Sequence, residues 1–456
     1  MKQTAMYENN AQTEEPEDDP IDESTLPDGT PLSDSDIEIL KDLNKKYAQV
    51  SFAGKNIIVS GKECPIQGEV YTFESPSDFK GKFWHKHYIG IGRQKNQGSV
   101  WLQWPGKNYL PNGAGFYPDP KKCPKGVFNF YRGFRVKPIE GDCTLYLDHL
   151  LKVICDGDEV SFNYLIGFLA HMVQQPDIKP SVAIVLKSVE GTGKGTMVSP
   201  VLKMLGSHGI QTNGAYAIAG RFNSSMANKL LAFCDEVEMI DKYLSDRIKA
   251  LISETTVNLE RKGLEIEPLP NYCRFVFASN HTRVINAGIR ERRYLVLEPS
   301  ADKAQNSDYF EKLWEWVNNG GSSKLLHYLM NVDISDFNPY KCPQTKALIA
   351  EKLDNLGGIN RYFYNEIMLP EPFAGRARIN AHELVEDFIK RSKEDDLKVN
   401  IASARSLTGK MMAKLNIEVR GRSDRGQGKY YDLPIRSELV QQFADFLDIP
   451  VKELEL

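Results

Sequence analysis

Residues 181–196 read SVAIVLKSVEGTGKGT, and the interpretation of the whole chain starts from this stretch. The five apolar residues Val182–Leu186 predict a strand that is buried on both faces. A glycine-rich turn follows, and apolar residues then recur at helical spacing from Met197 to Leu205. Strand, glycine loop and helix are the context of a phosphate-binding loop, in which backbone N–H groups, a helix dipole and a lysine bind an anion. An ordinary glycine-rich turn is the alternative.

The stretch departs from the pattern GxxxxGK[ST] at two positions. Ser188 stands where the pattern has glycine, and Gly195 stands where it has serine or threonine. We expect Lys194 to reach the outer phosphates of a nucleotide and the Thr196 hydroxyl to bind Mg²⁺. The predicted nucleotide-binding residues are Glu190, Gly191, Thr192, Gly193, Lys194, Gly195 and Thr196.

The composition is that of a globular protein of several domains. The chain has 456 residues, 41% of them hydrophobic and 26% charged, which is enough for about three domains. No run approaches the ~18 apolar residues of a membrane span, and the N-terminus does not resemble a signal peptide. Seven widely spaced cysteines without a CxxC pair argue against a zinc site and a disulfide framework. We therefore expect a cytoplasmic protein without membrane contact.

The net charge of −4 is unevenly distributed. Residues 1–40 carry a net charge of −11, and the remainder carries +7. A basic body behind an acidic segment is compatible with nucleic-acid binding. Residues 1–36 have few large apolar side chains, so we expect a disordered acidic tail there.

The next segment, 37–150, is expected to form an irregular α+β domain. Short strand-like runs at 49–52, 57–59, 70–73 and 99–104 alternate with Gly/Pro turns. Its aromatic residues fit a small core, with stacking on nucleic-acid bases as the alternative. The histidines at 85, 87 and 149 lack other metal ligands nearby in the sequence, so we expect them to be at the surface or satisfied by hydrogen bonds.

Residues 151–340 are predicted to form an α/β domain with a parallel sheet. Residues 159–174 have the apolar spacing of an amphipathic helix, and short apolar strands follow at 230–234, 275–278 and 294–297. Buried strands separated by helices are typical of parallel sheets.

Two acids follow the strand at 230–234. The carboxyl ends of parallel strands lie at one edge, so Asp235 and Glu236 should lie near the glycine loop. Nucleotide hydrolysis needs one carboxylate to hold Mg²⁺ and one to polarise water. We assign Asp235 to the metal and Glu236 to the water; an acidic loop after a core strand is the alternative.

Three further elements follow in order. Residues 257–267 (VNLERKGLEIE) predict a hairpin with a basic tip at Arg261 and Lys262, which suits a nucleic-acid backbone. Asn280 ends the next strand and is placed to orient water or sense the γ-phosphate, although Asn is also a common turn residue. Arginines 290, 292 and 293 precede the last strand, where a guanidinium can stabilise a transferring phosphoryl group; surface salt bridges are the alternative.

The last segment, 341–456, has the pattern helix, helix, hairpin. Helices are expected at 381–391 and 403–415, and two strands at 417–433 around a Gly/Arg-rich turn. This is a winged-helix pattern. Its cations Arg420, Arg422, Arg425 and Lys429 are candidate DNA contacts, and a purely structural hairpin remains open.

Taken together, these elements resemble the superfamily 3 helicases of viruses, phages and plasmids. The resemblance is greater to the helicase module of phage and mobile-element primase-helicases, a group that includes the poxvirus type. It covers roughly residues 40–350. It is carried by LNKKYAQVSFAGK, WLQWPG, YRGFRVKPIEGDC, YLIGFLAHMVQQP, VEGTGKGT, AGRFNSSMANKLLAFCDEVE, KALISETTVNLERKG, NYCRFVFASN and ERRYLVLE.

The resemblance implies an AAA+-like P-loop ATPase core that assembles as a ring, commonly a hexamer, around single-stranded DNA. It implies ATP and Mg²⁺ as cofactors and hydrolysis at subunit interfaces. Lys194 and Thr196 then bind nucleotide and metal, Asp235 and Glu236 form the Walker B pair, and Asn280 is the sensor. Arg293, with Arg292 as the runner-up, matches the arginine that reaches a neighbour's site, and Lys262 matches the lysine of the DNA-contacting hairpin.

Two other functions remain open. The GKGT sequence of the loop also resembles nucleoside-phosphate kinases, although here the loop lies past residue 190. A DNA-binding origin or regulatory ATPase that does not unwind DNA is the other alternative. No primase motif is evident in 37–150, so under the helicase interpretation we expect either a stand-alone helicase or the helicase part of a longer primase-polymerase.

Overall fold

The structure is a computed structural model that divides into two units, residues 1–132 and 133–456. This boundary lies earlier in the chain than the predicted one at 150. Residues 133–150 belong with the second unit, where the Arg135 N–H donates to Met204 O at 2.9 Å and the Tyr146 hydroxyl to Met197 O at 2.6 Å. The residues described are 22–52, 54–64, 68–85, 88–89, 95–220, 223–239, 241–259, 267–394, 399–421 and 428–454.

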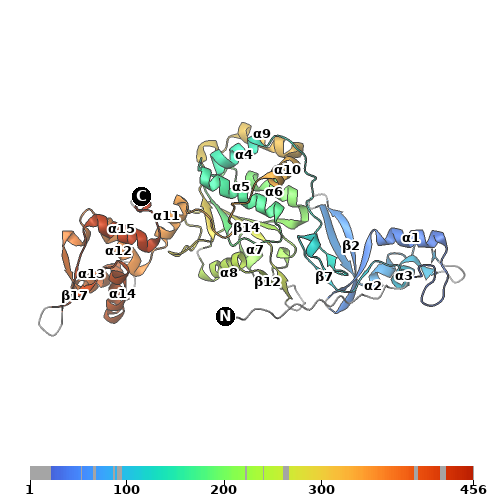
Figure 1. The fold of residues 1–456 in the computed structure, drawn as a ribbon, viewed down its shortest axis with the longest axis horizontal. Helices are drawn as coiled ribbons and strands as arrows, with labels where there is room; N and C mark the ends of the chain where they lie inside the picture. The colour runs from blue at the N-terminus through green and yellow to red at the C-terminus, as the bar shows by residue number, and fades with distance from the viewer. Residues whose placement is uncertain are drawn as a thin grey trace, which may run out of the picture. The chain divides into compact units, whose positions relative to one another are not determined.

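The first unit is an α+β fold around a small aromatic core. Its main sheet, which contains the strand labelled β2 in Figure 1, has the order β3-β2-β1-β6, with β1, β2 and β3 antiparallel. Trp101 and Trp104 are fully buried in the core, which confirms the core interpretation for them, whereas Trp84 is exposed. The elements are α1 (Asp34–Asn44), β1 (Tyr47–Phe52), β2 (Lys55–Cys64), β3 (Gly68–Glu74), α2 (Pro76–Gly81), β4 (Tyr88–Ile89), β5 (Lys95–Asn96), α3 (Gln97–Gln103), β6 (Tyr109–Leu110), β7 (Ala114–Gly115) and β8 (Phe128–Asn129).

Two predictions for this unit are wrong. Residues 99–104, expected as a strand, belong mainly to helix α3, whose first turn is capped by the Asn96 side chain accepting from Ser99 N at 2.8 Å. Residues 22–36, expected to be disordered, contribute Leu26 and Leu32 to the core. Residues 1–21 of the predicted acidic tail lie outside the described part of the chain.

The centre of the second unit is a five-stranded sheet of order β10-β11-β14-β9-β15, in which every pair is parallel. All of Val182–Leu186 is buried, as the sequence predicted. Its strands are β9 (Ala183–Lys187), β10 (Gly209–Asn213), β11 (Leu231–Asp235), β14 (Arg274–Ser279) and β15 (Tyr294–Leu297). The sheet thus confirms the parallel α/β arrangement.

Helices cover both faces of this sheet (Figure 1). Alternate side chains, such as Ala183, Val185 and Phe275, pack on the face that α7 and α8 cover. Helices α5, α6 and α10 pack together on the other side. The helical segments are α4 (Thr144–His149), the π-helix η2 (Leu150–Ile154), α5 (Glu159–Gln174), α6 (Lys194–Leu205), α7 (Tyr216–Ala219), α8 (Lys242–Ser253), α9 (Ser307–Trp316), the π-helix η6 (Val317–Gly321) and α10 (Ser322–Asn331).

The C-terminal part of this unit has a hydrophobic core of its own. Helices α12, α13 and α14 pack on one another beside an antiparallel sheet of order β16-β18-β17. The predicted helices and the two hairpin strands are present, and β16 is an additional strand. The elements are α11 (Lys346–Asp354), α12 (Gly358–Met368), β16 (Arg378–Asn380), α13 (Ala381–Glu394), α14 (Ile401–Lys414), β17 (Val419–Arg420), β18 (Tyr430–Asp432) and α15 (Arg436–Leu447).

None of the helices in the described ranges has the length and apolar character needed to cross a membrane.

Candidate nucleotide-binding site

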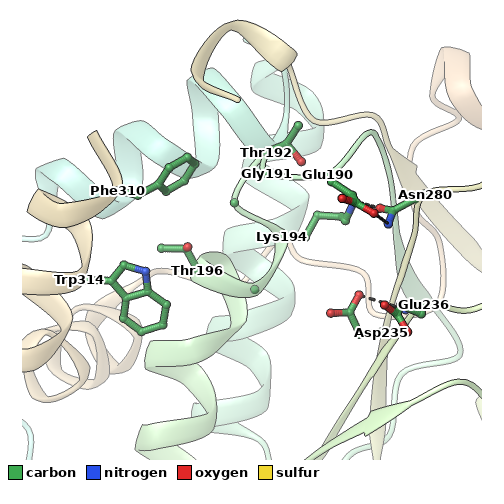
Figure 2. A pocket seen from close by; sticks show the side chains of 12 residues that line it. Glu190, Gly191, Thr192, Lys194, Thr196, Asp235, Glu236, Asn280, Phe310 and Trp314 are labelled. Carbon is green, nitrogen blue, oxygen red and sulfur yellow. Dashed lines mark hydrogen bonds between the residues drawn. The ribbon is translucent and has the colours of Figure 1, made fainter. Parts of the chain in front are cut away.

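A cavity of about 510 Å³ lies at the carboxyl edge of the central sheet (Figure 2). The loop after β9 forms its centre, and residues that end or follow β11 and β14 form one wall. The parallel sheet therefore brings together the three segments that the sequence predicted to meet. The lining residues are Glu190, Gly191, Thr192, Gly193, Lys194, Gly195, Thr196, Asp235, Glu236, Asn280, Phe310 and Trp314.

The loop needs glycine at position 193. Gly193 has φ = 89°, in the left-handed region that side chains disfavour. A Cβ there would lie 2.6 Å from His149 Cε1 and 2.7 Å from Phe310 Cε1. Ser188, which replaces the glycine of the usual pattern, closes the loop with a 2.7 Å hydrogen bond between its hydroxyl and that of Thr192.

Helix α6 begins at Lys194, directly after this glycine. Gly193 is its N-cap, so no side chain caps the first turn. The first backbone N–H groups of a helix lack intrahelical partners, and its dipole favours negative charge there. The start of α6 is therefore a suitable anion-binding position at the centre of the cavity.

The Lys194 ammonium group is held by oxygen atoms at the cavity wall. It donates to Ser188 O at 2.8 Å, to Val189 O at 3.1 Å and to Asn280 Oδ1 at 2.6 Å. Only 8% of the residue is exposed, and this burial lowers the pKa of Lys194, while Asp235 and Glu190 act in the opposite direction. An incoming phosphate would supply the counter-charge that favours the protonated form.

Asp235 and Glu236 lie together at the end of β11, on the same side of the cavity as Lys194 and Asn280 (Figure 2). The Glu236 backbone is left-handed, with φ = 53°, and its N–H donates to Asp235 Oδ1 at 3.0 Å. A non-glycine residue in this conformation is uncommon and is found preferentially at functional sites. The strained turn holds both carboxylates beside the loop.

Asn280 contacts two other residues that line the cavity. It follows β14, the strand between β9 and β11 in the sheet. Its amide oxygen accepts from Lys194, and its Nδ2 lies 3.5 Å from Glu190 Oε1. Asn280 thus lies within hydrogen-bonding distance of the lysine that the sequence predicts to bind phosphate.

The side chains at the cavity fit a magnesium ion bound with a nucleotide. Mg²⁺ prefers hard oxygen ligands and is usually held by one or two protein side chains together with substrate phosphates. Thr196, 6% exposed, offers a hydroxyl and Asp235 a carboxylate, and both line the cavity. Within the described ranges, no group of three or more His, Cys, Asp or Glu residues forms an independent metal site.

The arginines precede β15, at the edge of the sheet where the strands begin, opposite the cavity. Arg293 directly precedes β15, and its backbone oxygen accepts from the N–H of Ala183 at the start of β9 at 2.7 Å. Its side chain contacts Glu291 at 3.4 Å and donates to Ser253 Oγ at 2.9 Å. Neither it nor Arg290 or Arg292 is among the residues that line the cavity of its own chain.

The two predicted DNA-contacting hairpins are described in part. Strands β12 (Thr256–Leu259) and β13 (Glu267–Pro270) pair antiparallel, so a hairpin is present, with its second strand later in the chain than the predicted residues 264–266. Their connection at 260–266, which contains Arg261 and Lys262, lies outside the described residues. In the second hairpin Arg420 pairs with Asp432 at 3.4 Å and Lys429 is exposed; Arg422 and Arg425 fall in another stretch that is not described.

Three residues at the site were not predicted from the sequence. His149 supports the loop from behind: its Nε2 lies 3.4 Å from Gly193 O, and its Nδ1 lies 3.0 Å from the Tyr309 hydroxyl. Phe310 and Trp314, four residues apart on α9, line the cavity itself. Their spacing on one helical face was the available signal, but it did not indicate which surface that face contacts.

The chain is similar in sequence to a protein family and to a curated phage protein. Residues 186–293 match a family of unknown function, DUF5906. Over 228 residues the chain is 27% identical to the DNA primase-polymerase of Nitratiruptor phage NrS-1; this match covers 49% of the chain and 31% of that protein. The chain thus spans less than a third of its curated relative in that match.

The fold is shared with solved structures of the C-terminal region of NrS-1. An apo structure of that region superposes with a TM-score of 0.64 at 15% identity, covering 88% of this chain and 99% of that chain. An A-form apo structure gives 0.64 at 16% identity, with 86% and 97% covered.

Proposed function

We propose that this chain is an ATP-dependent DNA helicase that acts in the replication of a phage or mobile genetic element. The observation that carries the proposal is the convergence of Lys194, Asp235, Glu236 and Asn280 on one cavity at the start of α6. An ammonium group, a helix N-terminus and paired carboxylates are the groups that phosphoryl transfer from a nucleotide requires.

Each side chain has a distinct role in the proposed hydrolysis. Lys194 binds the outer phosphates, in place of the carbonyl oxygens that it now contacts. Glu236 accepts a proton from the attacking water, and Asn280 orients that water or reports on the terminal phosphate. Thr196 and Asp235 would hold Mg²⁺, which neutralises charge on the phosphate oxygens when it is bound.

Arg293, at the other edge of the sheet, cannot complete this site within one chain. Strands of four to six residues separate the two edges by roughly 15 Å. We therefore assign Arg293, with Arg292 as the alternative, to the site of a neighbouring subunit in a ring, for which a hexamer is the expected size. An arginine supplied across an interface stabilises charge in the transition state.

The comparisons support a role in DNA replication. The sequence relative is a DNA primase-polymerase, and the shared fold is that of the C-terminal region of the same phage protein. We further propose that DNA is contacted by Arg261 and Lys262, in the connection between β12 and β13, and by Arg420, Arg422 and Lys429. A separate primase or polymerase is a further expected partner.

The direct test of this proposal is the effect of DNA on ATP turnover. Single-stranded DNA should increase phosphate release by the full chain, and a nucleoside monophosphate should not accept the γ-phosphate. Formation of a nucleoside diphosphate from the added monophosphate would instead indicate a nucleoside-phosphate kinase.

A second assay separates a helicase from a DNA-binding ATPase that does not unwind. The proposed mechanism has ATP binding move the Lys262 hairpins, which drag one strand through the ring. Lys262→Ala should therefore retain ATP hydrolysis and lose separation of a forked duplex. Full unwinding by this variant would contradict the role of the hairpin, and absence of unwinding by the wild-type chain would favour the regulatory ATPase.

A further inference from the structure

We propose that helix α9 carries the nucleobase-binding face of this site, formed by Phe310 and Trp314. The inference rests on the proposed function, because it assumes that the cavity takes a nucleoside triphosphate. It extends that function by naming the residues that contact the base, which lie outside the phosphate-binding pattern. The position of the base also sets the direction in which the nucleotide lies.

The first observation is the shape of the cavity. It extends from Asp235 and Asn280 across the start of α6 to Phe310 and Trp314. In Figure 2 the two aromatic residues lie on one side of Thr196, and Lys194, Asp235 and Asn280 lie on the other. A triphosphate bound by Lys194 therefore leaves the aromatic end for the remainder of the nucleotide.

The second observation is that Phe310 is held firmly against the loop. Its ring lies 6.1 Å from that of His149 and 5.2 Å from that of Tyr309, both nearly edge-on. A Cβ on Gly193 would be only 2.7 Å from its Cε1. The position of Phe310 is thus fixed relative to the helix N-terminus that binds the phosphates.

The third observation is the exposure of Trp314. It lies one helical turn beyond Phe310, on the same face, and it remains 40% exposed at the cavity. Lys203 lies over its ring, with Nζ 5.8 Å from the centroid, and also donates to Asn318 Oδ1 at 2.9 Å. The indole is therefore restrained on its own chain and still accessible to a ligand.

Aromatic side chains are suitable partners for a base at this position. Every nucleobase has a flat π-face, so stacking gives affinity without a particular hydrogen-bonding pattern. Stacking on the indole would also cover apolar surface that is exposed in the free protein. Phe310 and Trp314 are thus expected to contribute to nucleotide affinity but not to contact the phosphates.

The test compares a ligand that has a base with one that lacks it. The affinities of ATP and of inorganic tripolyphosphate, each with Mg²⁺, are measured for the full chain and for Trp314→Ala. ATP binding should weaken roughly 5- to 150-fold, as expected for the loss of one stacked aromatic side chain, and tripolyphosphate binding should not change. Trp314→Phe should retain most of the ATP affinity.

One control variant and one second test variant accompany this measurement. Trp84→Ala removes an exposed tryptophan of the first unit and should change neither affinity. Phe310→Leu keeps apolar volume beside Gly193 and should weaken ATP binding selectively. A thermal melt of each variant establishes that it is folded.

The results separate this inference from the proposed function. Unchanged ATP affinity in both Trp314→Ala and Phe310→Leu would overturn the base assignment and leave the nucleotide site intact. An equal loss for both ligands would also overturn it, because these side chains would then only support the loop. If the wild-type chain binds neither ligand, the proposed function itself fails, and this inference with it.

Discussion

At the scale of single residues, the two glycines beside Lys194 are expected to differ sharply in tolerance. Gly193 has a left-handed backbone and close contacts with His149 and Phe310, whereas a Cβ on Gly195 would meet nothing within 4 Å. Gly193→Ala should reduce nucleotide affinity by at least about tenfold, because the strain and the clash shift the loop. Gly195→Ala should cost less affinity than Gly193→Ala, since its Cβ meets no protein atom and alanine is favoured over glycine in a helix.

Nucleotide titration of the two purified variants checks this contrast. Equal affinities would show that the conformation of the loop at Gly193 does not control binding.

Three buried histidines make the stability of the fold depend on pH. Burial lowers the pKa of His149, His171 and His208 from 6.5 to about 4. Between these values the unfolded chain binds protons that the folded chain does not, so stability should fall as the pH falls from 6.5 to 4. Each histidine contributes a slope of about 1.4 kcal/mol per pH unit within this window.

Urea unfolding at pH 7.5 and pH 5.0 measures this effect. His208→Gln should show a smaller loss on acidification than the wild type, and His382→Gln, at an exposed position, should behave like the wild type. A wild-type midpoint that does not move between the two pH values would contradict the prediction.

The residues of the site divide into those that the sequence reveals and those that it does not. Lys194, Asp235, Glu236 and Asn280 could be predicted because each is adjacent to a buried strand of a parallel sheet, and such strands present their carboxyl ends at one edge. His149 and Phe310 reach Gly193 from segments more than 40 and 110 residues away along the chain. No local pattern encodes a contact of that kind.

At the scale of secondary-structure elements, a buried ion pair joins α11 to β9, the strand before the glycine loop. Lys187 at the end of β9 lies 3.1 Å from Glu351 Oε1, and the glutamate is completely buried. Glu351 also accepts from the backbone N–H groups of Val284 and Ile285. The segment after Asn280 is thus tied to the same helix.

Removing only the glutamate of this ion pair should destabilise the fold. Glu351→Ala leaves a nearly buried ammonium group and two backbone donors without their partner, and we expect a loss of about 3–5 kcal/mol in the free energy of unfolding. The double variant Lys187→Met with Glu351→Leu should lose less free energy of unfolding than Glu351→Ala, because no unpaired charge is left buried.

Urea unfolding provides the measurement, and Glu383→Ala provides the control. The Arg376–Glu383 pair is more than half exposed on both side chains, so its loss should cost no more than about 1 kcal/mol. A similar small cost for Glu351→Ala would show that the buried pair does not hold the two elements together.

Helices and strands were predicted correctly where the spacing of apolar residues in the sequence matches the side chains that are buried in the structure. Strands β9 and β15 and helix α5 were predicted close to their observed bounds. Residues 99–104 were mistaken for a strand because their apolar residues fit either pattern over so short a run. Tertiary contacts stabilise the helix instead: Trp101 Nε1 donates to Asn44 Oδ1 at 2.8 Å and Trp104 Nε1 to Glu23 O at 2.9 Å.

At the scale of the whole molecule, the separation of Lys194 and Arg293 predicts a site shared between subunits. Lys194→Ala and Arg293→Ala should each abolish ATP hydrolysis when assayed alone. In a mixed assembly, some interfaces combine the intact lysine of one variant with the intact arginine of the other. Mixing the two inactive variants should therefore restore a fraction of the wild-type rate.

The result depends on the arginine acting in a neighbouring chain. If Arg293 served the site of its own chain, every subunit in the mixture would carry a defective site, and no activity would return. Substantial hydrolysis by Arg293→Ala alone would exclude it as a catalytic group and direct attention to Arg292.

The most direct test of the account is phosphate release from ATP in the presence of single-stranded DNA, measured together with ATP binding. We predict hydrolysis by the wild-type chain, binding without hydrolysis by Glu236→Gln, and neither binding nor hydrolysis by Lys194→Ala. A wild-type chain that releases no phosphate, or a Glu236→Gln variant that hydrolyses ATP at the wild-type rate, would contradict the assignment of this cavity as an ATPase site.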